Sequence, residues 1–272
     1  LADTYGLLPG YNFALTKDAM PKAKTYAEEA IKLNPNLASA YTSIAWVQNT
    51  YEYDWTEAEI NYKKAIQLNP NYATGNHWYG LCLADIGRIE EGIQTVLKAT
   101  QLDPTSKIIK HSLSITYWMA KQNSLALNAV NEALAIDPFF PLALHTKYSR
   151  LQANRETAIE RLTEALLVYP DQPTLRQTLF DVHWRNGNRE AAKDRLIELL
   201  DKYHNSFRKN HIAQIYFLMG KTDDGYRWLE KSIELRESFL FQLPTDPNFE
   251  ELRKQPRFRE LFKKINHPLY VD

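Results

Sequence analysis

The chain has 272 residues, of which 44% are hydrophobic and 24% are charged. Lys plus Arg and Asp plus Glu each number 33, so the formal net charge is zero and the usual electrostatic argument for nucleic acid or an acidic membrane surface is absent. The single cysteine, Cys82, excludes a disulfide within the chain and lies in an apolar stretch that favours a small core side chain.

The sequence carries no segment that would insert into a membrane, because no run approaches the ~20 apolar residues that span a bilayer. A secretory signal pattern is also absent from the start of the sequence. The chain begins at Leu1, within residues of helical pattern, so we expect it to be a fragment or a processed product. The sequence leaves the compartment unknown: a cytoplasmic location is favoured, and a membrane span in a parent protein would allow a periplasmic one.

Proline-ended segments recur along the first two thirds of the chain. The unit that they define is one helical hairpin, which cannot bury its apolar face alone, so stacked neighbours create the core. We therefore expect one continuous array of hairpins. The endings fall at Pro35, Pro70, Pro104, Pro138 and Pro170, at steps of 35, 34, 34 and 32 residues.

Within each unit, large apolar residues recur at helical spacing, and small residues recur where two helices must approach closely. We expect a first helix, a turn and a second helix that the terminal proline stops, because proline lacks an amide donor and clashes with the preceding turn. In the third unit the first helix carries Tyr79, Gly80 and Leu83, Gly87 makes the turn, and the second helix carries Gly92, Val96 and Ala99. In the fourth unit the corresponding residues are Leu113, Ser114 and Tyr117, followed by Ala126, Val130 and Ala133.

This order of large, Leu, small, aromatic, Ala, large, Ala and Pro residues resembles the tetratricopeptide repeat. The resemblance implies an all-α, right-handed superhelical solenoid of about seven antiparallel hairpins with a C-terminal capping helix. Residues 1–237 form the array and 238–272 the cap. The units are 4–35, with a degenerate first helix, and 38–70, 73–104, 107–138, 141–170, 173–203 and 206–236.

Two further stretches resemble a bacterial subfamily of these domains. One is the insertion from Tyr51 to Trp55 with the later segment from Tyr72 to Tyr79, and the other is the tail from Asp246 to Leu261. Members of that subfamily form the C-terminal region of signalling proteins with winged-helix transcriptional regulator, adenylate-cyclase-like or kinase modules. The resemblance implies a sensory or interaction domain in signal transduction.

The tail has an apolar stripe, and an array needs such a segment to cover its last hairpin. We expect an amphipathic capping helix that starts near Pro256, in preference to a helix on a membrane surface. The stripe comprises Phe249, Leu252, Phe258, Leu261, Phe262 and Ile265.

The first helices line the concave groove in the family that this chain resembles. His77, His111 and His145 are 34 residues apart, so they should form a ladder along that groove. A shared metal is disfavoured, since packed helices lie ~8–10 Å apart and zinc ligands must come within ~2.1 Å. The favoured interpretation is packing and hydrogen bonding between neighbouring first helices; our working hypothesis is a groove wall that binds acidic groups when protonated near pH 6.

Tryptophans accompany the ladder, as core residues or as anchors of a peptide site. The Lys and Asn clamp by which some tetratricopeptide domains hold a chaperone's C-terminal carboxylate is absent, because the corresponding positions hold other residues, such as Thr42 and His77. The candidate groove residues are Thr42, Trp46, Asn49, His77, Leu81, His111, Ile115, Trp118, His145, Gln177, Asp181, Trp184, Asn210 and Gln214.

Catalytic motifs are absent: there is no Gly-rich phosphate loop, no His-Glu-x-x-His and no Gly-x-Ser-x-Gly. The acidic cluster of Glu52, Asp54, Glu57 and Glu59 could be taken for a carboxylate pair, but acids favour the positive end of a helix, and a solvated helix start is the better account. We predict no catalytic residue, no metal and no cofactor.

The sequence therefore predicts a scaffold that binds a protein or peptide partner, or a small effector, without binding nucleic acid directly. The alternative is a homo-oligomerisation module, in which an edge helix or the uncapped first unit pairs across a two-fold axis in a homodimer. The motive is the degenerate first unit, which accommodates Leu7, Leu8, Tyr11 and Phe13 poorly. An enzyme ranks last.

Overall fold

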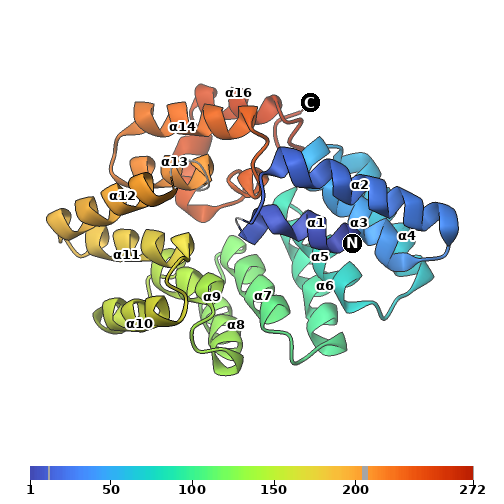
Figure 1. The fold of residues 1–272 in the computed structure, drawn as a ribbon, viewed down its shortest axis with the longest axis horizontal. Helices are drawn as coiled ribbons and strands as arrows, with labels where there is room; N and C mark the ends of the chain where they lie inside the picture. Colours follow the sequence, from blue (N-terminus) through green and yellow to red (C-terminus); the bar gives the residue numbers. More distant parts are fainter. Residues whose placement is uncertain (12, 204–207, 272) are drawn as a thin grey trace. The chain divides into compact units, whose positions relative to one another are not determined.

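The structure is a computed structural model that describes residues 1–11, 13–203 and 208–271 (Figure 1). Helices make up most of the described residues, and no β-strand occurs among them. The all-α expectation is confirmed. The chain forms two compact units: unit 1 contains residues 1–104 and 230–272, and unit 2 contains residues 105–229.

Unit 1 contains the first three hairpins and the C-terminal segment. We call the leading member of each hairpin its first helix and the other its second helix. The hairpins are α1 (Ala2–Leu7) with α2 (Thr16–Leu33), α3 (Ala38–Val47) with α4 (Trp55–Leu68), and α5 (Ala73–Asp85) with α6 (Ile89–Leu102); the C-terminal segment contains η4 (Leu240–Gln242), η5 (Pro247–Phe249), α15 (Glu250–Arg253) and α16 (Pro256–Lys263).

Unit 2 continues the same alternation. Two first helices extend into a π-helical turn, η2 (Gln48–Glu52) after α3 and η3 (Thr146–Arg150) after α9. The helices are α7 (Lys107–Met119), α8 (Asn123–Ile136), α9 (Pro141–His145), α10 (Arg155–Val168), α11 (Pro173–Arg185), α12 (Arg189–Tyr203), α13 (Lys209–Leu218) and α14 (Thr222–Glu234), whose last turn belongs to unit 1.

The recurring Asn-Pro and Asp-Pro endings form the link between hairpins. The side chains of Asn34, Asn69 and Asp137 each accept a hydrogen bond from the backbone N–H two residues later, at 3.0, 3.1 and 3.1 Å. These short-range bonds close a turn just after the second helix ends. The amide or carboxylate therefore redirects the chain, and the following proline prevents the helix from continuing.

Both helices of the third hairpin carry glycine where they cross, and neither position has room for a Cβ. A Cβ on Gly80 would lie 2.9 Å from the Val96 backbone nitrogen, and one on Gly92 would lie 2.7 Å from the Gly80 carbonyl oxygen. The predicted turn at Gly87 is confirmed, with φ of +90°. Small residues at this crossing therefore set the distance between α5 and α6.

The C-terminal segment packs against the first two hairpins within unit 1. The Trp55 ring meets Phe241 edge-to-face at 5.9 Å and His267 at 5.3 Å, and the Trp46 ring meets Phe239 at 6.4 Å. The predicted helix at Pro256 is confirmed as α16, which buries Phe258, Leu261 and Phe262. The red C-terminal end accordingly lies close to the blue N-terminal helices in Figure 1.

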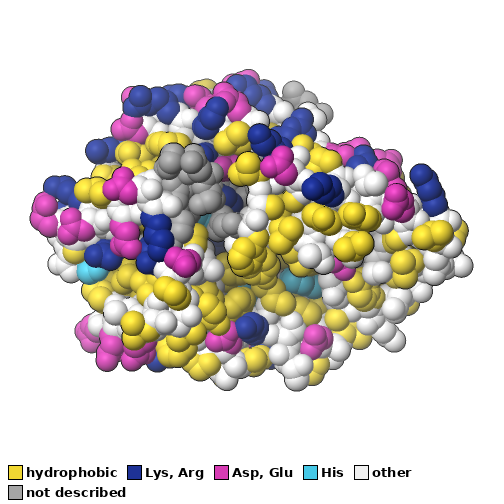
Figure 2. Space-filling model, viewed as in Figure 1, with side chains coloured by type: hydrophobic (Ala, Val, Ile, Leu, Met, Phe, Trp, Pro, Cys, Tyr) yellow, Lys and Arg dark blue, Asp and Glu magenta, His cyan; other side chains and the backbone are white. Residues whose placement is uncertain are grey.

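Several large apolar side chains of unit 1 remain on the surface. Leu1 and Phe13 are each 78% exposed, and Leu15 is 50% exposed. Figure 2 shows hydrophobic side chains over α1. Among the described residues, no helix is long and apolar enough to cross a membrane.

Candidate ligand-binding face

The first helices bury many polar side chains together with apolar ones, whereas the second helices bury mainly apolar residues, with Thr16 and Ser232 as the polar exceptions among the described residues. The buried residues of α6 and α8 are glycine, alanine, valine and isoleucine alone. Within each unit, we call the polar side of the first helices the first-helix face of that unit. The buried polar residues of these helices include Thr42, Ser43, Asn49, Asn76 and His77 in unit 1, and His111, Ser112, Ser114, Thr116, Thr146, Ser149, Thr174, Gln177, Thr178, Asp181 and Asn210 in unit 2.

In unit 1, the predicted groove residues are held by the protein itself. The Thr42 hydroxyl donates to the Ala38 carbonyl at 3.2 Å, and the Asn49 amide lies 3.2 Å from the Tyr62 hydroxyl. Trp46 donates its indole N–H to the Gly6 carbonyl at 3.1 Å. Thr42, Trp46, Asn49, His77 and Leu81 are each at most 9% exposed, so in this structure they form the wall beneath the face.

In unit 2, the predicted histidine ladder is a set of hydrogen bonds between neighbouring first helices. His111 Nε2 lies 3.0 Å from Thr146 Oγ1, and His145 Nδ1 lies 3.0 Å from Thr178 Oγ1. The Thr178 hydroxyl already donates its hydrogen to the Thr174 carbonyl at 2.7 Å, so it must accept from His145 Nδ1. The favoured structural interpretation is confirmed for these two histidines.

Burial opposes the hypothesis that the ladder titrates near pH 6. Burial lowers the pKa of His77 to about 4. The protein atoms around His145 also desolvate its ring, and this burial, together with the charges of Arg150, His111 and Arg208, lowers its pKa well below the usual value. His77 and His145 therefore stay neutral near pH 6, and for these two the hypothesis is wrong.

A buried carboxylate marks the middle of the first-helix face in unit 2. Asp181 is 5% exposed and accepts a hydrogen bond from the Ser149 hydroxyl. Burial raises the pKa of Asp181 to about 6, although Ser149, Arg185 and Arg150 act in the opposite direction. One turn earlier in α11, Gln177 is 1% exposed, and its Oε1 has no hydrogen-bond partner among the described residues.

The remaining predicted residues of unit 2 differ in accessibility. His145, Trp184 and Gln214 keep partial exposure on this face. Trp118 is 3% exposed, and the Arg150 guanidinium lies over its ring at 4.6 Å. The Trp184 indole donates to the Leu218 carbonyl at 3.1 Å. Ile115 and Asn210 are buried as well, so few of the candidate side chains offer an open surface.

Sequence reasoning missed the hydroxyl partners of the ladder and the arginine beside it. Thr146 and Thr178 each come from the first helix that follows the histidine they contact, and Ser149 and Arg150 lie in the π-helical turn η3. A signal was present in the repeat alignment. Ser112 and Thr146 are 34 residues apart, each directly after a ladder histidine.

The acidic cluster near α4 does not form a carboxylate pair. Asp54 caps α4 by accepting from the Glu57 backbone N–H at 3.1 Å, and Glu52 pairs with Lys24 at 2.6 Å. Asp54 and Glu52 thus each have a separate partner, as expected of acids at a helix start.

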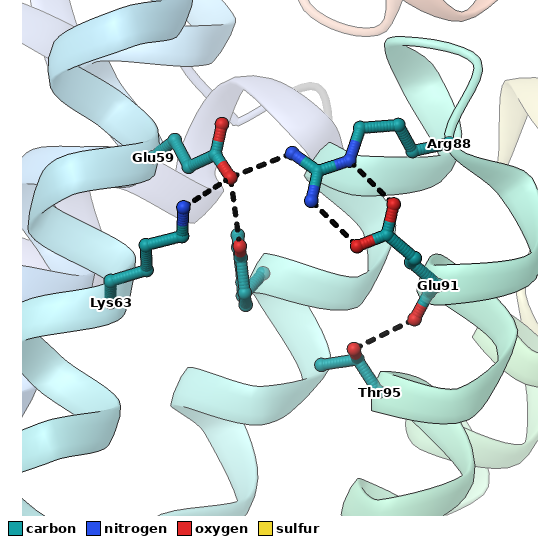
Figure 3. Close-up of polar contacts among 6 residues, drawn as sticks. Glu59, Lys63, Arg88, Glu91 and Thr95 are labelled. Carbon is teal, nitrogen blue, oxygen red and sulfur yellow. Dashed lines mark hydrogen bonds and ion pairs between the residues drawn. The ribbon is translucent and has the colours of Figure 1, made fainter.

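Glu59, further along α4, links neighbouring hairpins (Figure 3). Its Oε1 accepts from Lys63 at 2.8 Å, from Arg88 at 2.6 Å and from the Tyr79 hydroxyl at 3.1 Å, while Arg88 also binds Glu91. Burial alone would raise the pKa of Glu59, but hydrogen bonds from Lys63, Arg88 and Tyr79 lower it to about 2. The cluster therefore joins α4, α5 and α6.

Metal-ligating side chains do not gather in the part of the chain that the structure describes. No three His, Cys, Asp or Glu side chains there lie close enough to hold one ion. Cys82 is buried, and burial raises the pKa of its thiol far above the usual value. This side chain therefore stays protonated in the core.

Comparison with known proteins places these features in a repeat fold. Residues 73–106 match the tetratricopeptide repeat model. Human protein O-mannosyl-transferase TMTC3 is 24% identical over 265 residues, 93% of this chain and 25% of TMTC3. Transcriptional regulator HilA of Salmonella typhimurium is 30% identical over 105 residues, 39% of this chain and 19% of HilA. The chain thus spans a quarter or less of these relatives.

A solved structure covers nearly the whole chain. The crystal structure of the APC/C hetero-tetramer Cut9–Hcn1 matches with a TM-score of 0.61 and 17% identity, over 94% of this chain and 48% of the compared chain. Similarity at this identity concerns the fold. Together with the repeat match and the helical hairpins, it shows a solenoid of repeats.

Proposed function

We propose that this tetratricopeptide-repeat solenoid is a non-catalytic scaffold that binds a protein or peptide on its first-helix face. The row of buried polar side chains on that face is the main support. A core between packed helices needs no polar groups, and burying them costs free energy unless they are hydrogen-bonded. Hydrogen bonds within the protein, such as that between His111 and Thr146, offset this cost for several of these groups, and we place a hydrogen-bonding ligand beside the polar wall that they form.

The open positions of unit 2 fit an extended peptide. The half-buried Gln214 and Trp184 offer a hydrogen-bonding group and an aromatic surface. Gln177 Oε1 is buried without a hydrogen-bond partner among the described residues, so it would accept a peptide N–H when the ligand displaces the side chains that cover it. The zero net charge predicts no general attraction to one sign of charge, so contacts of this kind would supply specificity. A small effector with amide groups would use the same positions.

The test selects peptides from a random library on the wild-type chain and measures the Kd of the best one. Replacement of Gln177 by Leu and of Gln214 by Ala should each weaken binding, by about tenfold for Gln177 since a buried polar contact is lost. The control is Lys193→Ala on the exposed surface of α12, which should leave Kd unchanged. If only the control variant weakens binding, the first-helix face is not the site.

We further propose that the chain is the interaction domain of a larger bacterial regulatory protein. The support is the 105-residue match to a protein named as a transcriptional regulator. The output of the parent protein would then depend on whether the first-helix face is occupied. A genetic test follows: the Gln177→Leu change in the parent gene should alter its regulatory output while the protein level stays constant.

Self-association is the second candidate, supported by the exposed apolar side chains of the first hairpin. Leu1, Phe13 and Leu15 leave apolar surface in water, and a two-fold contact would bury it. Sedimentation velocity over a wide concentration range checks this. A species that stays monomeric throughout would remove the candidate.

A further inference from the structure

A pocket of about 660 Å³ lies on the C-terminal segment of unit 1, and none of its lining residues belongs to a first helix. Its apolar wall consists of Pro256, Leu269 and Val271. Its polar lining is mainly cationic, with a single acid: Arg253, Lys254, Arg259, Glu260, Lys263 and Tyr270.

The charges in this pocket are unequally compensated. Lys254 pairs with Glu251 at 2.5 Å, and Lys263 pairs with Glu260 at 3.2 Å. Arg253 and Arg259 have no acidic partner among the described residues. Their hydrogen bonds go to backbone carbonyls: Arg253 Nη1 donates to Pro244 and Asp246, both at 2.9 Å, and Arg259 Nε donates to Arg253 at 3.1 Å.

These carbonyl contacts hold the two guanidinium groups in position and leave donors unused. An arginine side chain carries five N–H donors in a planar fork. Each of these two arginines uses only some of its donors in hydrogen bonds within the protein. The Nη atoms of Arg259 make no hydrogen bond within the described residues. Two positive charges with free donors therefore line the same pocket.

Tyr270 supplies a third donor near these charges. Its ring packs against Phe258 at 6.3 Å and Phe262 at 6.2 Å, and its backbone N–H donates to the His267 carbonyl at 2.8 Å. Burial raises the pKa of Tyr270, and the nearby charges of Arg253 and Arg259 act to lower it, so the hydroxyl remains protonated at neutral pH. That hydroxyl has no hydrogen-bond partner among the described residues.

We propose that Arg253, Arg259 and Tyr270 form a binding site for the phosphate group of a phosphate monoester. A monoester carries a charge of about −1.5 to −2 at pH 7, which matches two uncompensated guanidinium groups. A carboxylate would leave one of them unbalanced. Planar arginines bind phosphate oxygens through paired N–H donors, and the apolar wall would contact the organic part of the ligand.

The site can be tested on the intact chain with inorganic phosphate as the probe, by following the backbone amide signals of residues 253–271. Wild type should show a saturable shift. Arg259→Gln should weaken phosphate binding by about tenfold or more, since a charge-assisted contact is lost. Tyr270→Phe, which keeps the ring packing, should weaken it by a smaller factor.

The matched control is Lys264→Gln, which removes one positive charge from an exposed neighbour that does not line the pocket. It should leave phosphate affinity unchanged. If Lys264→Gln weakens binding as much as Arg259→Gln, the effect is general charge and the site is refuted. Unchanged binding in Arg259→Gln refutes it as well.

Two further probes distinguish the source of the phosphate. A phosphoserine flanked by alanines in a short peptide represents a modified protein, and glycerol phosphate represents a small ester. Tighter binding of the peptide supports a phosphorylated partner, and tighter binding of glycerol phosphate supports a metabolite. If both bind no better than chloride at equal ionic strength, the pocket holds no phosphate site.

Discussion

Two carboxylates of this chain have opposite pKa shifts, and the difference lies in their partners. Glu59 accepts three hydrogen bonds, two of them from cations, and its pKa falls to about 2. Asp181 is more deeply buried, accepts from the neutral Ser149, and its pKa rises to about 6. The Asp181 charge is therefore unfavourable to the fold at neutral pH.

Replacement of Asp181 by Asn should stabilise the fold at pH 8. With a folded pKa of about 6 and an ordinary value of 3.8, the stability that Asp181 contributes is present below pH 3.8 and lost as pH rises through 6. Asn keeps an acceptor for Ser149 without the charge. The expected gain in unfolding free energy is about 1–3 kcal/mol at pH 8 and less at pH 4.5, measured by urea denaturation.

The exposed Asp171, paired with Lys202 at 2.6 Å, is a suitable control. Asp171→Asn should not raise stability at pH 8, since its pKa is lowered, first by the hydrogen bond from Lys202. A gain of the same size in both variants would mean that a general charge effect, and not burial, explains the result.

His77 should contribute to acid destabilisation. Its folded pKa of about 4 lies below the ordinary value of 6.5, so its contribution is present above pH 6.5 and lost as pH falls through 4. In His77→Gln, the unfolding free energy should fall less between pH 6.5 and 4, by up to about 3 kcal/mol. An unchanged pH dependence, with the fold intact by circular dichroism, would contradict this.

At the scale of elements, periodicity predicted the helices well and their polar contacts less well. The proline endings and Gly87 mark turns because their backbone chemistry is local. Thr146 and Thr178 were not predicted as partners of His111 and His145, because the repeat gives the register of neighbouring helices but not the rotamers that join them. The π-helical turn η3 also shifts Ser149 and Arg150 relative to an ideal helix.

The crossing of α5 and α6 gives an element-scale prediction. Gly80→Ala should cost about 2–3 kcal/mol of stability, because the added methyl group meets Val96 at 2.6 Å and backbone atoms at 2.9 and 3.0 Å. The comparison is Gly187→Ala, where φ is +81° and nothing lies within 4 Å of the new Cβ. That variant should cost only about 1 kcal/mol, from backbone strain. If urea denaturation gives the same loss of unfolding free energy for Gly80→Ala and Gly187→Ala, the structure relieves the crowding at the crossing of α5 and α6.

At the scale of the whole chain, the composition of unit 1 was not predictable from the repeat. Periodicity relates each hairpin to its neighbours, whereas Thr16 lies beside Ser238 and Trp55 beside Ile265, contacts across 222 and 210 residues. No sequence signal identified these pairs. The apolar stripe of the tail indicated that it would cover a hydrophobic surface, but not which hairpins supply that surface.

Residues in the C-terminal segment should therefore stabilise helices near the N-terminus. The Phe241 side chain is 1% exposed, and its ring contacts those of Trp55 and Phe239. Phe241→Ala should therefore lower the free energy of unfolding by about 3–5 kcal/mol. Because Trp55 begins α4, hydrogen exchange should speed up in α3 and α4 as well as in residues 238–271.

The same-sized change Phe180→Ala, at a fully buried position in unit 2, provides the contrast. Its faster exchange should centre on α11, α12 and α13, whose residues share its apolar cluster. If Phe241→Ala instead affects only residues 238–271, the C-terminal segment adds no stability to the first hairpins. Faster exchange in α3 and α4 would mean that the array gains stability from contacts beyond nearest neighbours, unlike a solenoid whose stability is a sum over adjacent repeats.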